Sequence, residues 1–142
     1  MAVIRDAKPK DLQAIKNILT LNGQIDDVTD EDIWNFIVVE VDKNVVGCGV
    51  LRDHGDSVEI AKVSVLSNHQ GKGYGMEIVL SLMGRIRGRP CWLLSVHSHS
   101  FWELFDFHIV PDEETPEYMR KQCRRCDRSA SCDRVIMFKK GI

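Results

Sequence analysis

Three consecutive segments rich in valine and isoleucine constrain the fold of this chain more than any other feature. They cover residues 36–40, 45–52 and 57–66, and short polar sequences separate them. These separators, 42–44 and 53–56, contain the aspartate, asparagine and glycine residues that favour tight turns. Segments of this kind joined by such turns predict three antiparallel strands connected by hairpins. The elements on either side of them then decide the fold class.

Helical spacing marks two longer segments that flank these strands. In residues 9–21 the apolar residues from Leu12 to Leu19 recur every three or four positions, and residues 76–87 repeat the pattern. Such stripes predict amphipathic helices. Their alternation with strands predicts an α+β sheet with helices on its faces. The other expected elements are short helices over 29–36 and 101–104, and strands over 3–5, 91–96, 107–110 and 134–138.

Composition bounds the class of protein. The 142 residues are 44% hydrophobic and 28% charged, as in an ordinary globular protein. This length predicts one domain, residues 1–142, with a basic, cysteine-containing C-terminal segment from about residue 115. No apolar run approaches the roughly 20 residues of a membrane span, and the N-terminus lacks the pattern of a secretion signal. We therefore expect a cytoplasmic protein, and the net charge of −2 gives no reason to expect nucleic-acid binding.

The segment 63–75 runs from an expected strand through a glycine-rich loop into an expected helix. Gly71, Gly73 and Gly75 let the backbone come close to a ligand, and the helix that follows offers unpaired amide groups at its positive end. This arrangement predicts an anion site. The loop lacks both the Gly-Lys-Ser/Thr ending of mononucleotide loops and the longer glycine spacing of dinucleotide loops. A tight left-handed turn that binds nothing is the alternative.

This loop resembles the acetyl-CoA loop of the GNAT superfamily of N-acetyltransferases, which reads Gln or Arg, two residues, Gly, one residue, then Gly or Ala. Gln70, Gly73 and Gly75 fill those positions. The resemblance covers nearly the whole chain and implies acetyl-CoA as co-substrate and the GNAT fold, a mixed, mostly antiparallel sheet of about six to seven strands flanked by about four helices. It implies that the pyrophosphate is bound by Gln70, Gly71, Lys72, Gly73, Tyr74 and Gly75, and the pantetheine and acetyl carbonyl by Val63, Ser64 and Val65.

A closer resemblance is to short, single-domain N-acetylglutamate synthases and related amino-acid N-acetyltransferases. Their fourth strand carries an acidic residue where Glu59 stands, and their tails carry cysteines similar to Cys123, Cys126 and Cys132. The resemblance implies transfer of an acetyl group to the α-amine of an amino acid, with glutamate favoured. Trp102 stands where tyrosine is frequent in the wider superfamily, so the group that protonates the leaving thiolate is open. Another amine acceptor, or a non-catalytic acyl-CoA-binding module, is the alternative.

Several residues are candidates for proton transfer. An amine must be neutral to attack a thioester, and an α-amine with a pKa near 8 is about one-tenth neutral at pH 7. Glu59 is the expected base, directly or through water; an exposed strand carboxylate is the alternative. His97 and His99 are candidates for relaying a proton or binding the substrate, and a surface or capping role is the alternative. Tyr118 is a candidate donor to the thiolate, with Ser98 as the other.

The C-terminal segment is the expected acceptor-binding region. Residues 120–140 hold eight Lys or Arg and two Asp, a local balance of 8 − 2 = +6. Arg120, Lys121, Arg124 and Arg125 are the candidates for binding an acceptor carboxylate. A solvated basic face is the alternative.

The cysteines of the same segment form half of a zinc pattern. The spacing Cys123-x2-Cys126-x5-Cys132 leaves three states open, free thiols, a local disulfide and a structural metal, and we assign no metal. Cys48 and Cys91 lie in expected strands and should be buried. We expect a small-molecule amine as partner and leave a homodimer open.

Overall fold

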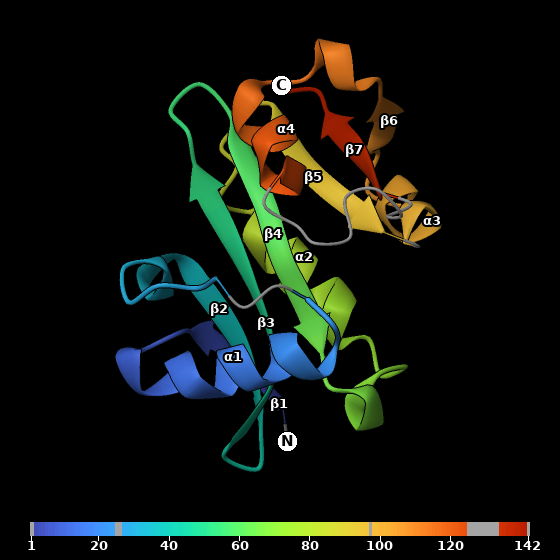
Figure 1. The fold of residues 1–142 in the computed structure, drawn as a ribbon. Coiled ribbons are helices and arrows are strands. Elements are labelled where there is room, and N and C mark those ends of the chain that lie inside the picture. The colour runs from blue at the N-terminus through green and yellow to red at the C-terminus, as the bar shows by residue number, and fades with distance from the viewer. Residues whose placement is uncertain (1, 25–26, 97, 125–133, 142) are drawn as a thin grey trace. The chain divides into compact units, whose positions relative to one another are not determined.

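The computed structural model describes residues 2–24, 27–96, 98–124 and 134–141. Within these ranges seven strands form one sheet in the order β1-β2-β3-β4-β5-β7-β6, and four α-helices accompany them (Figure 1). This confirms the expected mixed, mostly antiparallel α+β fold. The elements are β1 (Ala2–Asp6), α1 (Leu12–Leu21), β2 (Phe36–Val41), β3 (Asn44–Asp53), β4 (Val58–Val65), α2 (Tyr74–Met83), β5 (Cys91–Val96), α3 (His99–Glu103), β6 (His108–Val110), α4 (Glu117–Arg124) and β7 (Arg134–Lys139).

The chain divides into two compact units, which we call the first and second unit. The first unit comprises residues 1–52 and 60–87, and the second comprises residues 53–59 and 88–142. The expectation that residues 1–142 act as a single domain remains a prediction. No helix in the described ranges is long and apolar enough to cross a membrane.

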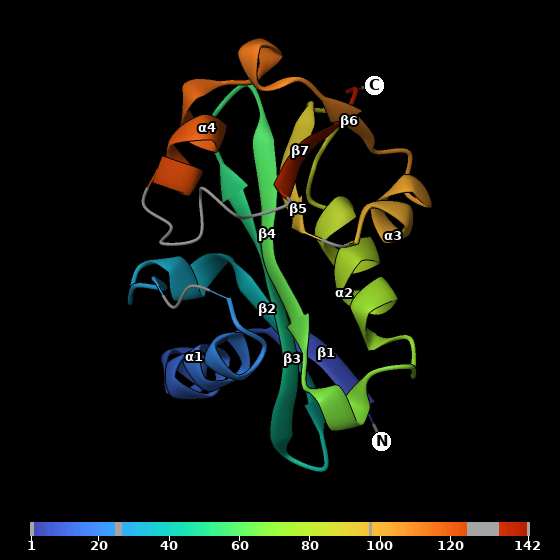
Figure 2. The same ribbon diagram turned by 45° about the vertical axis from the view of Figure 1, so that its right-hand side comes forward.

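The first unit is a strand meander with a helix on each face. β1 and β3 both pair antiparallel with β2. Between β2 and β3, Asp42 and Lys43 have φ angles of 50° and 70°, the left-handed backbone of the two-residue turns that match strand twist. Figure 2 shows α1 and α2 on opposite faces of these strands. The predicted hairpin therefore forms at the predicted turn.

Apolar side chains fill both faces of the first unit. Ile15, Ile18 and Leu19 of α1 are buried in one cluster with Phe36 and other strand residues, as the spacing predicts. On the other face a Cβ atom at Gly49 would lie 2.7 Å from Cγ2 of Ile78 and 3.2 Å from Cδ1 of Leu82. Only glycine lets α2 pack this closely on β3.

The second unit is built on β5. Residues Val58 and Glu59 of β4 pair parallel with β5, β7 pairs with it antiparallel over its whole length, and β6 adds to β7. Phe101, Trp102, Phe105 and Phe107 form an aromatic cluster around α3. Helix α4 has no counterpart among the helices predicted from the sequence. Its residues are mostly polar, and few of them are apolar, although Met119 is fully buried.

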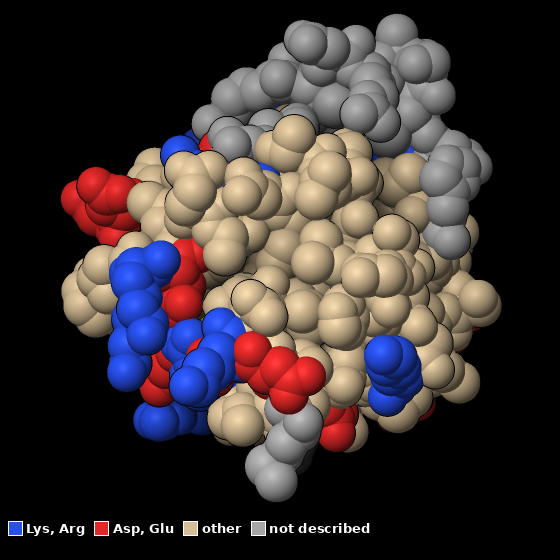
Figure 3. Space-filling view, turned by 90° about the horizontal axis from the view of Figure 1, so that it is seen from below, with Lys and Arg blue, Asp and Glu red and all other residues tan. Residues whose placement is uncertain are grey.

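Ion pairs join charged side chains in both units. The face in Figure 3 shows most of its Lys and Arg side chains among Asp and Glu side chains rather than in a patch of one sign. In the second unit Arg134 holds both carboxylate oxygens of Asp112, at 2.9 and 2.7 Å, and Arg89 pairs with Asp53 at 2.8 Å. Exposed pairs of this kind contribute little to stability.

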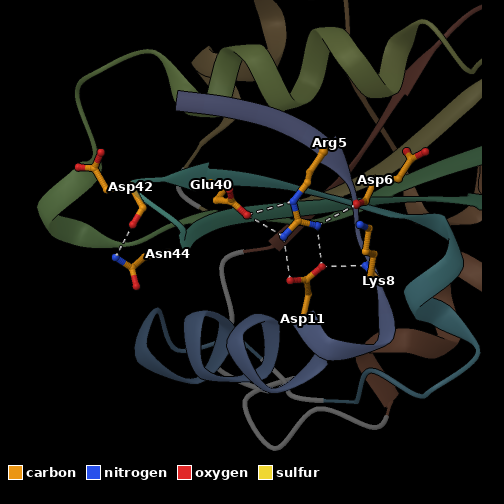
Figure 4. A network of polar contacts seen from close by, with 7 residues as sticks. All are labelled: Arg5, Asp6, Lys8, Asp11, Glu40, Asp42 and Asn44. Atoms are coloured by element: carbon orange, nitrogen blue, oxygen red, sulfur yellow. Dashed lines mark hydrogen bonds and ion pairs between the residues drawn. The ribbon is translucent and has the colours of Figure 1, made fainter. Parts of the chain in front are cut away.

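One ion-pair network of the first unit is more buried (Figure 4). The Arg5 guanidinium donates to both oxygens of Asp11, at 2.8 and 3.0 Å, and to Oε1 of Glu40 at 3.0 Å. Asp11 also accepts the backbone N–H of Lys8 at 2.7 Å and is only 4% exposed. Arg5 foremost, with the Lys8 amide, holds the pKa of Asp11 below its ordinary value. The network ties β1 and β2 to the turn that begins α1.

Candidate active site

The glycine loop has the backbone that the sequence predicts. Gly71 and Gly73 have φ angles of 79° and 86°, and α2 begins directly after Gly73. No described atom lies within 4 Å of a Cβ placed at Gly71, Gly73 or Gly75. The loop therefore leaves room beside the first amide groups of α2, which have no partner within the helix. An anion placed there would meet aligned N–H groups and the positive end of the helix.

Gln70 connects this loop to the end of β4. Its side-chain Nε2 donates to the carbonyl of Val65 at 2.9 Å, and its backbone N–H donates to the carbonyl of Ser67 at 3.4 Å. The amides expected to face a pyrophosphate are thus those that follow Gln70. Lys72 is exposed beside them.

The backbone of β4 changes direction at Lys62, which has a φ of 57° in the interior of the strand. Non-glycine residues seldom adopt this angle. Immediately after it, the carbonyls of Val63 and Val65 accept side-chain amides from the segment that follows α1, Gln24 at 3.3 Å and Asn22 at 2.9 Å. Asn22 also bonds to Oγ of the buried Ser64.

In the second unit a buried carboxylate organises the polar side chains that we call the Glu59 cluster: Glu59, His54, Ser57, Tyr118 and Gln122. Glu59 is 2% exposed. Its Oε1 lies 3.2 Å from Nε2 of His54, and its Oε2 accepts Nε2 of Gln122 at 2.7 Å. The hairpin between β3 and β4 and helix α4 supply these partners.

The Tyr118 ring lies against His54, with centroids 3.7 Å apart and planes 16° from parallel. Its hydroxyl is 2.5 Å from Oγ of Ser57. Burial raises the pKa of Tyr118; the bond to Ser57 opposes this and the negative charge of Glu59 adds to it. The phenol therefore stays protonated at neutral pH. The structure brings together Glu59 and Tyr118, two of the predicted proton-transfer residues.

The comparison with protein families decides the identity of the fold. The profile of the acetyltransferase (GNAT) domain matches residues 32–109, more than half of the chain. The chain belongs to the GNAT family. It is an acyl-CoA-dependent N-acetyltransferase with acetyl-CoA as its co-substrate. The open glycine loop before α2 fits this co-substrate, whose phosphates the amides of 71–75 would hold.

Similar proteins include other acetyltransferases and an N-acetylglutamate synthase. An uncharacterized N-acetyltransferase of Chlorobaculum tepidum is 24% identical over 96% of this chain and 94% of its own length. The amino-acid acetyltransferase of Neisseria meningitidis is 28% identical over 69% of this chain. The structure of N-acetylglutamate synthase from Neisseria gonorrhoeae, with coenzyme A and N-acetyl-glutamate, superposes on the whole chain with a TM-score of 0.82 at 24% identity and confirms the GNAT fold. The chain spans 24% of the length of the N. meningitidis protein and 35% of that of the N. gonorrhoeae protein.

Other predicted site residues of this GNAT chain have local partners, are exposed, or lie outside the described residues. Arg120 donates to Glu117 at 2.9 Å and to the carbonyl of Thr115, so its guanidinium is occupied within its own segment. Lys121 is exposed. His97, Arg125 and the side chain of Arg124 lie outside the described residues, so their predicted roles remain predictions.

The structure describes the side chains of two of the five cysteines. Cys48 and Cys91 are buried, as expected, and burial raises the pKa of Cys48 to about 12. Cys126, Cys132 and the side chain of Cys123 lie outside the described residues. Among the described residues no group of three or more His, Cys, Asp or Glu side chains could hold a metal ion.

The sequence did not single out three members of the Glu59 cluster. His54 belongs to a predicted turn and Ser57 begins a predicted strand, and polar residues are ordinary at both places. Gln122 follows Tyr118 by four positions and so shares its face of α4, but no helix was predicted there. Only the packing of the hairpin and α4 brings them together in the Glu59 cluster.

Proposed function

We propose that this enzyme acetylates the α-amine of a small carboxylate-bearing amino acid, with glutamate as the first candidate. The amino-acid acetyltransferase relative and the N-acetylglutamate synthase structure support this acceptor class. An α-amine suits the chemistry because a useful fraction of it is neutral at pH 7. Other small-molecule or protein amines are the alternative acceptors.

The Glu59 cluster is the observation that carries the proposal. Bound acetyl-CoA supplies a thioester carbonyl that an amine can attack. Glu59 accepts the proton that the amine loses, directly or through water, because a carboxylate can act as a general base. His54 and Gln122 hold the carboxylate in one orientation. The Tyr118 hydroxyl, kept protonated by its raised pKa, donates the proton that the thiolate requires.

An acceptor panel tests this function. Release of free thiol from acetyl-CoA is followed with glutamate, aspartate, glutamine, spermidine and a short peptide as acceptors. We expect saturable release with glutamate or another amino acid, at a kcat/KM at least about tenfold above that of spermidine, because a carboxylate-binding site disfavours a polycation. A higher kcat/KM with spermidine or the peptide would assign the enzyme to the alternative acceptors.

A further inference from the structure

Lys62 is the feature of β4 that the proposed chemistry does not yet use. Its φ of 57° lies in the left-handed region although strand residues flank it on both sides. Such backbone strain persists only where the surroundings impose it, and it is concentrated at functional sites. At this backbone angle, Lys62 interrupts the regular alternation of side chains between the two faces of the strand.

The ammonium group of Lys62 is mostly buried and holds a carboxylate that reaches solvent. Nζ lies 2.9 Å from Oδ1 of Asp27, and the exposed fractions of the two side chains are 13% and 54%. Burial alone would raise the pKa of Asp27, but the hydrogen bond and charge of Lys62, with the charge of Arg52, lower it below its ordinary value. Asp27 is therefore ionised at neutral pH. The position beside Lys62 is a carboxylate site, filled by a carboxylate of the chain itself.

The segment that carries Asp27 follows β4 in the opposite direction. Asn22 bonds to the carbonyl of Val65, Gln24 to the carbonyl of Val63, and Asp27 to the side chain of Lys62. The contacts with β4 therefore approach Lys62 as the segment proceeds from Asn22 to Asp27. Lys62 directly precedes Val63, the first of the residues expected to hold the pantetheine and acetyl carbonyl, and the Asp27 segment contacts both Lys62 and Val63.

We infer that Lys62 binds a carboxylate of the acceptor and that Asp27 occupies this subsite until the acceptor displaces it. The inference rests on the proposed function and names the residue that selects its substrate class. Exchange of one carboxylate for another never leaves the buried ammonium unpaired, which would be costly. A polyamine has no group that can make this exchange.

Asp27→Asn is the decisive variant, because the two explanations of the ion pair predict opposite effects. If Asp27 competes with the acceptor, its loss lowers the KM for glutamate by about threefold or more, since the subsite is open for a larger fraction of the time. The KM for acetyl-CoA stays unchanged. An unchanged or raised KM for glutamate would show that the pair only ties the segment to β4, and would overturn the inference. Asp6→Asn is the matched control, because it removes an exposed ion pair with Arg85 in the same unit.

Lys62→Met tests the cation itself while keeping an unbranched apolar side chain. We expect the KM for glutamate to rise at least about tenfold. Glutamine and isoglutamine each lack one of the two carboxylates of glutamate. The KM should change little for the one that lacks the carboxylate bound by Lys62. The amide that is unaffected identifies which carboxylate Lys62 binds. Equal effects on glutamate and on both amides would contradict a carboxylate role. Lys16→Met, at a partly buried lysine of α1, is the control.

Failure of the inference and failure of the proposed function give different results. If the parent protein acetylates glutamate but neither variant moves the glutamate KM in the expected direction, the function stands and the subsite is wrong. If no amine supports thiol release, the function is wrong, and calorimetric titration of glutamate into the CoA-bound protein then tests the subsite alone. Binding weakened by Lys62→Met and strengthened by Asp27→Asn would support it, and binding unaffected by both would refute it. In both cases the melting-temperature increase with acetyl-CoA shows that the variants are folded.

Discussion

At the scale of single residues, β4 carries two polar side chains in unusual settings. Glu59 is a buried carboxylate whose two oxygens accept bonds from different elements, and Lys62 is a mostly buried cation on a left-handed backbone. The sequence indicated the first through its resemblance to amino-acid acetyltransferases. It gave no sign of the second, because backbone strain and an ion pair with Asp27 have no linear pattern.

Replacing Glu59 by glutamine tests its role as proton acceptor. Glu59→Gln keeps the size of the side chain but removes its basicity, so we expect kcat with the preferred acceptor to fall by about 10²-fold near neutral pH. The affinity for acetyl-CoA, measured by thermal shift, should change little. Glu40→Gln, at a partly buried carboxylate of β2, should leave kcat nearly unchanged. Unaltered turnover in Glu59→Gln would move the proton-accepting role to solvent or to another residue.

At the scale of elements, predictability followed the strength of the local pattern. The hairpin at 42–44 and the helix over 9–21 were predicted because turn residues and an apolar stripe are local signals, although Pro9–Asp11 form a 3₁₀ turn before α1. Helix α2 begins two residues earlier than predicted and ends at Met83, because Gly84 and the left-handed Arg87 and Gly88 follow. Helix α4 was missed because tertiary packing of Met119 and Tyr118, not its mostly polar sequence, stabilises it.

The loop before α2 can be tested with two matched glycines. Gly73 and Gly55 both have positive φ angles, 86° and 88°, and neither has a described atom within 4 Å of an added Cβ. Valine at either position imposes a similar backbone strain. Only Gly73→Val should abolish the melting-temperature increase caused by acetyl-CoA, because only there would the side chain fill the space beside the α2 amides. Equal loss of the increase in both variants would point to general strain instead of a pyrophosphate site.

At the scale of the whole molecule, the order of elements was predictable but the pairing of distant side chains was not. Alternating strand and helix patterns predicted an α+β sheet with helices on its faces, and the resemblance of the glycine loop to the acetyl-CoA loop implied the GNAT fold. The partners of Glu59 come from a hairpin and from α4, and those of Arg5 come from the 3₁₀ turn before α1 and from β2. Such contacts depend on how elements pack, which no local pattern encodes. The stability of the first unit rests in part on one of them.

The Arg5 network makes the stability of the fold depend on pH in a defined direction. The pKa of Asp11 is lowered on folding, chiefly by Arg5, so this carboxyl stabilises the fold at pH values above its unfolded pKa near 3.9 and loses that effect as the pH falls through the folded pKa. Asp11→Asn should lower the free energy of unfolding by about 2 kcal/mol at pH 7, and the difference from the parent should shrink below about pH 4. Urea unfolding at pH 7, 5 and 3 measures this, with Asp6→Asn as the exposed control, expected to change stability by no more than about 0.5 kcal/mol. A loss of equal size at pH 3 and pH 7 would mean that Asp11 acts through packing and hydrogen bonding that its charge does not govern.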